Sequence, residues 1–500
     1  MTACSCVQQY VRGGEAFENE YLLQHAALIA KHNALFEVPD VTNFAEYTSI
    51  NGVPASLAFA AAGPSPGKLE TFRYPNGRSK TRDFAVATFA DHLRLRLIGE
   101  ALVVPLSALL GDRAFAPRIV PGKTPWLLEP KGAAYERWLE DAREACAAHR
   151  TVIRTDVRKY YPSIKPNVLF ESIAPWVPDR VVTDLQKMLA PWWAIDGLFG
   201  LPIGPEISGV LGDALLARLD NALKEGGVRS NRFMDDIHLF GRVELPQGGL
   251  SIVDSVLQGL GLQRAEEKTL FFDDSREAMR SLRSQEMSAL GSMLRLRGAE
   301  QRRAAREEMH EFCESNLWNP EVSASTYRWI LKTLGNKKDQ YAVEMIVRSS
   351  DLAEIDPRVT AEYLGRVNAF VRPDVIEMIG MLLGEEGERV ESVQLHLLRA
   401  LVACNAASPD LGVRAYTNMV QKQETQPSLR AWAISASSHA AMMDSEELVY
   451  LALDEDEPLV VCRAAVASMM RTELSFLRAA ANCDDPQVQD TANWMLRKAA

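Results

Sequence analysis

The sequence feature that most constrains the fold and function of this chain is a pair of adjacent acidic residues in a strand-like stretch. Asp235 and Asp236 lie within Asn231–Phe240, where apolar and aromatic residues flank them on both sides. Such flanks favour a β-hairpin with the acids at its tip. Two neighbouring carboxylates repel one another unless a cation, a salt bridge or a proton compensates their charge. An isolated acidic pair is also typical of a plain turn or a helix N-terminus, so its meaning depends on the rest of the chain.

The length of 500 residues and the apolar fraction of 47% predict two to four domains, or one large fold with an appendage. No apolar run approaches the roughly 18 residues of a membrane span. The start of the chain has no basic region followed by an apolar one, so we expect no signal peptide. The seven cysteines are scattered without zinc-ligand spacing, which favours reduced thiols and a cytoplasmic location.

The formal net charge of −11 by itself disfavours a nucleic-acid partner, but the charge is unevenly distributed. Residues 68–165 contain 18 Lys and Arg against 11 Asp and Glu, whereas residues 301–500 contain 21 against 30. A basic region inside an acidic chain suits a phosphate-binding channel, and ordinary surface scatter is the alternative. The acidic C-terminal part is expected to contact protein rather than a phosphate backbone.

A basic hairpin is expected shortly after residue 68. Strand-like runs at Leu69–Tyr74 and Lys80–Val86 flank the turn sequence Pro75-Asn76-Gly77-Arg78, in which Asn-Gly tolerates positive φ. Lys80 and Arg82 on this hairpin could hold a triphosphate or a template backbone. A solvated basic hairpin is the alternative.

Helices are predicted on both sides of a Gly- and Pro-rich loop that follows residue 195. Residues 167–195 are expected to be helical, and Ser208 could cap the helix that follows the loop. Gly204 in the loop lets the backbone approach a ligand closely.

The C-terminal part is predicted to be helical and repetitive. Three similar elements begin near Pro427, Pro458 and Pro486. An acidic residue precedes each of the last two prolines, and an acid followed by proline is typical of a helix start. The elements resemble HEAT repeats, in which two helices recur in units of this length. Arg430 and Arg463 match that pattern and Gln489 departs from it. A generic helical bundle is the alternative.

Four pieces that could carry chemistry follow one another in residues 151–270. They are a strand ending in Asp156 with Tyr161 five residues later, the loop Leu201-Pro202-Ile203-Gly204, the hairpin Phe233-Met234-Asp235-Asp236, and Glu267-Lys268-Thr269 after a Gly-Leu turn. In this order they resemble the palm of reverse transcriptases. The resemblance covers roughly residues 68–300. It implies an α+β, right-hand fingers-palm domain between an N-terminal helical segment (1–67) and an all-α, solenoid-like repeat domain (301–500).

The resemblance also assigns roles to individual residues. Asp156 and Asp235 would bind two Mg²⁺ ions, with Asp236 as a weaker ligand or support and the backbone carbonyl of Val157 as a further ligand; Mn²⁺ could replace Mg²⁺. Tyr161 would stack under the sugar and select deoxynucleotides, or else be a packed core aromatic. Residues Lys80, Arg82, Pro202, Gly204 and Lys268 would contact the nucleotide, with a solvated surface role as the alternative for Lys268. His238 is interpreted as structural.

Two departures indicate a branch of this family. Ile203 stands where retroviral and intron enzymes have Gln, and Phe233 stands where they have Tyr. These residues and the helical extension look closer to the bacterial abortive-infection and defence-associated reverse transcriptases. That likeness implies an antiphage role, a homo-oligomer, and DNA synthesis that is untemplated or templated by a partner RNA. It also implies priming from a tyrosine; the candidates in the extension are Tyr327, Tyr341, Tyr363, Tyr416 and Tyr450.

Two other functions stay open at this point. A retron-type reverse transcriptase would extend a dedicated structured RNA and leave DNA on an RNA 2′-OH. A non-catalytic scaffold would keep the palm as a relic beside a binding module. The presence of all three acids argues against the scaffold.

Overall fold

The fold was analysed in a computed structural model. It describes residues 69–75, 81–111, 131–194, 199–282, 298–384, 391–422, 425–454, 456–469 and 474–499, with a few positions between them. The described chain is mixed α and β, with two small sheets and a helical C-terminal part. None of its described helices combines the length and apolar character needed to cross a bilayer. The helices expected before residue 60 lie outside the described residues.

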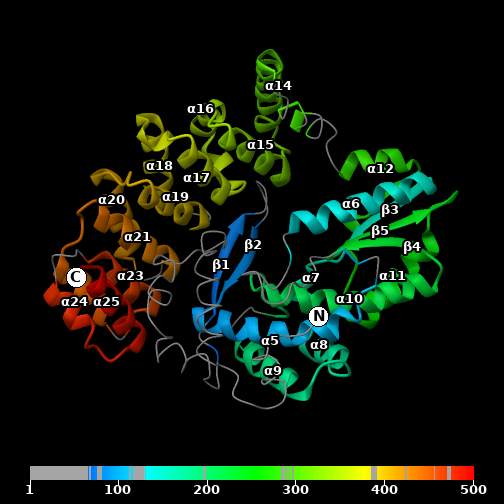
Figure 1. Cartoon of the computed structure of the whole chain (residues 1–500), viewed down its shortest axis with the longest axis horizontal. Coiled ribbons are helices and arrows are strands. Elements are labelled where there is room, and N and C mark those ends of the chain that lie inside the picture. Colours follow the sequence, from blue (N-terminus) through cyan, green and yellow to red (C-terminus); the bar gives the residue numbers. More distant parts are fainter. Residues whose placement is uncertain are drawn as a thin grey trace. The chain divides into compact units, whose positions relative to one another are not determined.

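The chain forms two compact units (Figure 1). The first is built on Ala87–Ser292, and the second combines Glu70–Val86 with Met293–Ala500. The sequence predicts the basic hairpin as part of the palm domain and a domain boundary at residue 300. The structure instead groups the hairpin with the helical unit and ends the first unit at Ser292.

A four-stranded antiparallel sheet is the centre of the first unit. Its strand order is β4-β5-β3-β6. The strands are β3 (Thr151–Asp156), β4 (Arg229–Phe233), β5 (Asp236–Gly241) and β6 (Leu270–Phe272). The helices are α5 (Phe89–Ser107), α6 (Lys131–Ala148), α7 (Tyr160–Ser163), α8 (Pro166–Ile173), α9 (Asp179–Trp193), α10 (Glu206–Glu225), α11 (Gln247–Gly259), the 3₁₀ turn η2 (Glu266–Lys268) and α12 (Ser275–Leu282).

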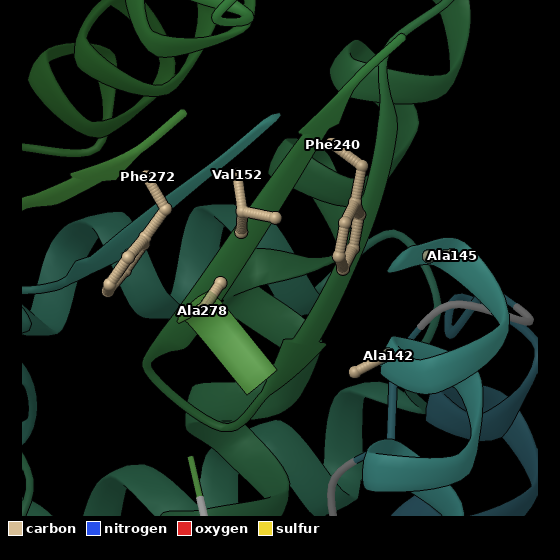
Figure 2. Packing of buried hydrophobic residues seen from close by; sticks show 6 residues of the cluster. All are labelled: Ala142, Ala145, Val152, Phe240, Phe272 and Ala278. Carbon is tan, nitrogen blue, oxygen red and sulfur yellow. The ribbon is translucent and has the colours of Figure 1, made fainter. Parts of the chain in front are cut away.

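One face of this sheet packs against α6 and α12. Val152, Phe240 and Phe272 lie side by side on β3, β5 and β6, because the strand register pairs Val152 with both phenylalanines. Ala142 and Ala145 of α6 and Ala278 of α12 close the same cluster (Figure 2). Burial of these apolar side chains fixes the register, since a shift by one residue would turn them to the opposite face.

Two expectations about helices in this unit need correction. Residues 167–195 are helical but interrupted, because α8 ends at Ile173 and α9 begins at Asp179, directly after Pro178. Ser208 does not cap α10; the helix begins two residues earlier, after Pro205, with Glu206 in its first turn. Ser208 is therefore inside the helix and buried, and its hydroxyl has no partner among the described residues. Pro205 has a fixed φ suited to a helix start, which explains the earlier boundary.

The second unit is a run of helices in which alternate members pack on one another. Contacts link α15 to α17, α17 to α19, α19 to α21, α21 to α23 and α23 to α25. The helices are α14 (Ala299–Leu317), α15 (Ala324–Asn336), α16 (Tyr341–Arg348), α17 (Pro357–Arg366), α18 (Pro373–Gly384), α19 (Glu391–Ala403), α20 (Pro409–Ala415), α21 (Pro427–His439), α22 (Ser445–Leu453), α23 (Leu459–Ser468), α24 (Leu474–Ala480) and α25 (Pro486–Ala499). The three proline-containing elements noted in the sequence start α21, α23 and α25.

The strands of the basic hairpin, β1 (Glu70–Pro75) and β2 (Thr81–Val86), pair as expected and pack on these helices. The Tyr74 hydroxyl donates to Asp356 before α17, and the Tyr74 ring contacts His396 of α19 edge-on. The carboxylate of Glu70 accepts hydrogen bonds from the backbone N–H and hydroxyl of Ser428, in the first turn of α21. These contacts, formed across almost the whole chain length, explain why the hairpin belongs to the helical unit.

Candidate functional site

The turn between β4 and β5 presents the acidic pair. Met234 and Asp235 form the turn, and Met234 has a positive φ of 55°. A positive φ at the first of two turn residues matches the twist of the flanking strands. The strand register then places Asp236 opposite Asp156 at the end of β3. Two acids more than 70 positions apart in the sequence are thereby neighbours across paired strands.

Asp156 is a buried carboxylate with uneven surroundings. Its Oδ2 accepts a hydrogen bond from the ammonium group of Lys268. Its Oδ1 is buried and has no hydrogen-bond partner among the described residues. A buried carboxylate oxygen without a partner is unfavourable, and a cation or an added donor is the usual remedy.

Asp235 and Asp236 differ strongly in environment. Asp236 is exposed, whereas Asp235 is partly buried at the turn. Burial, followed by the charges of Asp156 and Asp236, raises the pKa of Asp235 from its usual value to about 7. The charges of Asp156 and Asp236 therefore disfavour ionisation of Asp235, and a bound cation would relieve this repulsion.

Asp156 and Asp235 supply only part of the ligand set that a hard divalent cation needs. Among the described residues, no group of three or more His, Cys, Asp or Glu side chains is arranged to hold a metal ion. Asp156 and Asp235 thus provide two carboxylates, and other oxygens would have to complete the set. Mg²⁺ commonly takes one or two protein carboxylates together with water and substrate phosphates.

The backbone of Val157 faces the acidic turn. Val157 forms an antiparallel bridge with Arg264, and the two hydrogen bonds around it join Ala265 to Asp156 and Arg158 to Gln263. In this arrangement the N–H and C=O of the bridged residue point away from the bridge partner. The carbonyl of Val157 therefore points to the side of β3 on which β5 and its acids lie.

Tyr161 and the Gly- and Pro-rich loop are brought together. The carbonyl of Tyr161 accepts a hydrogen bond of 2.9 Å from the backbone N–H of Leu201. Gly200 has a φ of 79°, and a Cβ there would lie only 2.3 Å from the same carbonyl oxygen. Pro202 is buried behind this contact, and Gly204 is exposed with a φ of 133°. The Tyr161 side chain is partly buried.

The remaining predicted residues belong to other parts of the chain. Arg82 is exposed on β2, in the second unit. Lys80 lies outside the described residues. His238 is buried against Trp138, whose ring stacks on it at 4.5 Å between centroids, and burial lowers the pKa of His238 to about 3. This neutral, stacked imidazole agrees with a structural role.

Sequence reasoning missed Arg232, which is buried beside the acidic turn and bonded to Asp213 and Asp220 of α10. A signal for it was present. An arginine three residues before Asp235, inside a strand otherwise expected to be half-buried, requires a buried partner. The sequence alone did not identify that partner, because both aspartates lie on a helix whose facing side depends on tertiary packing.

In comparisons with known proteins, the chain matches no protein-family model and no curated protein. Among solved structures it is similar to telomerase from Candida tropicalis in complex with a TWJ fragment of telomeric RNA, with 13% identity and a TM-score of 0.30. The match covers 73% of this chain and 63% of that chain, so the chain spans less than two thirds of the telomerase chain. Because a similarity this weak carries no argument, function is inferred from the site itself.

Proposed function

We propose that this chain is a DNA-synthesising nucleotidyltransferase of the reverse transcriptase kind. The observation that carries the proposal is the pairing of Asp156 and the Asp235–Asp236 turn at one end of an antiparallel sheet. Asp156 has a buried oxygen without a described partner, and Asp235 has a raised pKa beside it. The order of motifs in the sequence supports the same function.

The chain's own residues would divide the work as follows. Asp156, Asp235 and the carbonyl of Val157 would hold Mg²⁺, with Asp236 as support. Two bound Mg²⁺ ions supply a lowered pKa for the attacking hydroxyl and charge neutralisation for the pyrophosphate leaving group. Lys268, whose side chain is 51% exposed, would exchange its contact with Asp156 for a triphosphate oxygen. Arg82 and Lys80 as triphosphate ligands remain a prediction of the sequence alone.

The proposal is tested by incubating purified full-length protein with Mg²⁺ and labelled deoxynucleotides. We expect a product that deoxyribonuclease degrades, formed by the wild-type protein and lost on addition of a chelator. The Asp236→Asn variant should retain more activity than Asp156→Asn, because Asp236 is exposed and less confined. Absence of product with both Mg²⁺ and Mn²⁺, across several RNA and DNA templates, would contradict the proposal.

Replacing Tyr161 with Ala is expected to weaken discrimination against ribonucleotides. Removal of the ring leaves room for a 2′-OH, and loss of one steric contact changes selectivity by about 10- to 100-fold. The measurement is the ratio of kcat/KM for a deoxynucleotide and the matching ribonucleotide. Trp176→Ala serves as the control, because that aromatic side chain lies in the same unit and is exposed. An unchanged ratio in Tyr161→Ala would indicate that the Tyr161 ring has a packing role and does not select the sugar.

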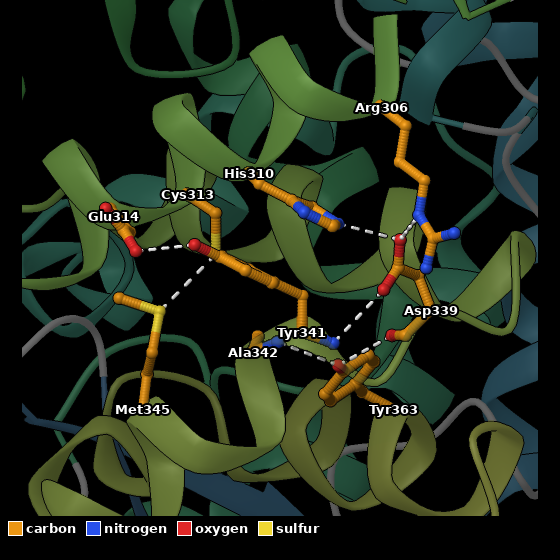
Figure 3. Close-up of polar contacts among 9 residues, drawn as sticks. All are labelled: Arg306, His310, Cys313, Glu314, Asp339, Tyr341, Ala342, Met345 and Tyr363. Carbon is orange, nitrogen blue, oxygen red and sulfur yellow. Dashed lines mark hydrogen bonds and ion pairs between the residues drawn. The ribbon is translucent and has the colours of Figure 1, made fainter. Parts of the chain in front are cut away.

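The proposal includes priming from a tyrosine, and burial separates the five candidates. Tyr327 is fully buried and its hydroxyl pairs with Thr360, and Tyr363 is buried with its hydroxyl on the carbonyl of Asp339. Tyr341 is partly buried, and its hydroxyl donates to Glu314 (Figure 3). A carboxylate in this position can accept the hydroxyl proton when the oxygen attacks a phosphate.

Of the other two candidates, Tyr416 is partly buried and Tyr450 is exposed. The hydroxyl of Tyr416 donates to Glu447, and the side chain of Tyr450 is 68% exposed. We therefore expect mass spectrometry of nuclease-treated protein to find a nucleotide on Tyr341, Tyr416 or Tyr450. An adduct on Tyr327 or Tyr363 would contradict the ranking. DNA joined to an RNA 2′-OH, with unmodified protein, would favour a retron-type enzyme.

The antiphage role and the homo-oligomer remain parts of the proposal that rest on the resemblance. A phage challenge of cells carrying the wild-type or the Asp235→Ala protein tests the first. The mass of the full-length protein in solution tests the second. Full-length protein is the better material for this test, because removal of residues beyond 300 would also remove the helices on which β1 and β2 pack.

A further inference from the structure

Arg232 is a buried side chain beside the acidic turn, and its guanidinium group forms several hydrogen bonds. It is 2% exposed, and it uses Nε, Nη1 and Nη2 in four hydrogen bonds. Two bonds of 2.9 and 2.6 Å reach the two carboxylate oxygens of Asp220. One of 2.5 Å reaches Asp213, and one of 2.8 Å reaches the backbone carbonyl of Met234. The planar guanidinium makes such a set in a fixed geometry that lysine cannot reproduce.

The bond to Met234 acts on the turn that carries Asp235. Met234 has a positive φ of 55°, which is unfavourable for a residue other than glycine. Such a conformation persists only when surrounding contacts determine it. Because the carbonyl of Met234 belongs to the peptide group that continues into Asp235, Arg232 fixes the orientation of that residue relative to α10.

The same turn of α10 also contacts the segment after Asp156. The hydroxyl of Tyr160 donates a hydrogen bond of 2.5 Å to the carbonyl of Gly212. A Cβ at Gly212 would lie 3.0 Å from the ring of Tyr160 and 3.1 Å from the ring of Tyr161. Gly212 and Asp213 are consecutive, so one helical turn contacts the Tyr160–Tyr161 segment directly and the Asp235 turn through Arg232.

We propose that the Gly212-Asp213 turn of α10, with Arg232 as its connector, sets the position of Asp235 relative to Asp156 and Tyr161. Arg232 and Asp213 are positioning residues, because they act on the reacting groups through Met234. The expected effect on nucleotide addition rests on the proposed function. The positioning of Asp235 itself rests only on the contacts of these buried residues.

The most informative variant is Asp213→Asn. It keeps the size of the side chain and leaves the bidentate Arg232–Asp220 pair in place. Arg232→Gln is less suitable, because it would leave two buried carboxylates without their cation and could prevent folding. Asp141→Asn is the matched control. Asp141 pairs at 2.6 Å with Arg229, which lies on the same strand as Arg232, and accepts a hydrogen bond from Asn231. Among the described residues, no hydrogen bond or ion pair of Asp141 or Arg229 reaches Met234 or Asp235. Gly212→Ala is a second variant. It changes no charge, and its added methyl group would crowd the rings of Tyr160 and Tyr161.

Two readouts are compared for each variant: amide hydrogen exchange in a peptide spanning Phe233–Ile237, and kcat against KM for a deoxynucleotide. For Asp213→Asn we expect at least about tenfold faster exchange and at least about tenfold lower kcat, with a smaller change in KM. Asp141→Asn should match the wild type in both.

Wild-type exchange and wild-type kcat in a folded Asp213→Asn protein would overturn the inference. If Asp213→Asn does not fold, the same two readouts on Gly212→Ala decide. If the wild-type protein itself adds no nucleotide, the proposed function fails, and the exchange rates alone support or overturn the positioning role.

Discussion

Replacing Asp235 with Asn is expected to abolish nucleotide addition and, in metal-free buffer at alkaline pH, to stabilise the fold. The loss of activity should be on the order of 10³-fold or more, as for other residues that act as part of a catalytic unit. The gain in stability follows from the raised pKa of Asp235, which burial and the charges of Asp156 and Asp236 produce. An amide removes this charge and keeps the shape of the side chain.

The pH dependence has a defined sign. In the unfolded chain Asp235 loses its proton near its ordinary pKa of 3.8, whereas in the folded protein it keeps the proton up to about 7. Between these values the folded state binds the extra proton, so wild-type stability falls as the pH rises through this window. The fall amounts to about 1.4 kcal/mol for each unit of pKa difference. Asp235→Asn should lack this fall.

Urea unfolding of both proteins between pH 4 and pH 8 in the presence of a chelator measures the effect. The two curves should approach each other near pH 4 and separate toward pH 8, with the variant more stable. Asp236→Asn is the control, because its exposed carboxylate should give a smaller separation. A variant less stable than the wild type at pH 8 would show that Asp235 is compensated in the fold, and would count against the proposed cation site.

The second large effect concerns the helical unit. Replacing Arg430 with Ala is expected to lower the free energy of unfolding by about 3–5 kcal/mol. Arg430 of α21 pairs with Glu457 before α23, both side chains are only 7% exposed, and the guanidinium also donates to the carbonyl of Val420. Alanine would leave the Glu457 carboxylate buried without its cation. This ion pair connects two of the three elements that share a sequence pattern.

The matched control is Arg348→Ala, which breaks an exposed pair within one helix. The Arg348 and Glu344 side chains are 67% and 63% exposed, so the loss should be below about 0.5 kcal/mol. Urea denaturation of the full-length proteins, followed by circular dichroism, provides the comparison. Adding Glu457→Gln to Arg430→Ala should recover part of the loss. Equal losses in the two single variants would refute a stabilising buried link between α21 and the segment before α23.

The local elements of the fold could be predicted where short-range patterns decide them. The β3 strand, the β4–β5 hairpin and the strands β1 and β2 follow from alternation and turn residues, and each is present. The break between α8 and α9 was not predicted, although Pro178 directly before α9 is a signal for a helix start. The assignment of the hairpin to the helical unit could not be predicted, because its partners Asp356 and Ser428 are about 280 and 360 residues away.

The candidate site divides in the same way. The order of Asp156, Tyr161, the Gly-Pro loop and the Asp235–Asp236 turn is visible in the sequence. The structure pairs Asp156 with Asp236 across two strands, and the backbone of Tyr161 with that of Leu201 in the loop. The pairing of Lys268 with Asp156 and the role of Arg232 were not accessible. Both depend on which side of a helix or turn faces the sheet, and this is decided by long-range packing rather than by local preference.

The central claim is that Asp156 and Asp235 together hold a divalent cation, and the position of bound Mn²⁺ tests it most directly. Crystals of the full-length protein soaked with Mn²⁺ and a deoxynucleotide would be measured at a wavelength at which manganese scatters anomalously. The account predicts an anomalous peak between the Oδ1 atom of Asp156 and the carboxylate of Asp235, with Lys268 displaced from Asp156. A bound nucleotide with no peak at these carboxylates, and with the Lys268–Asp156 pair intact, would contradict it.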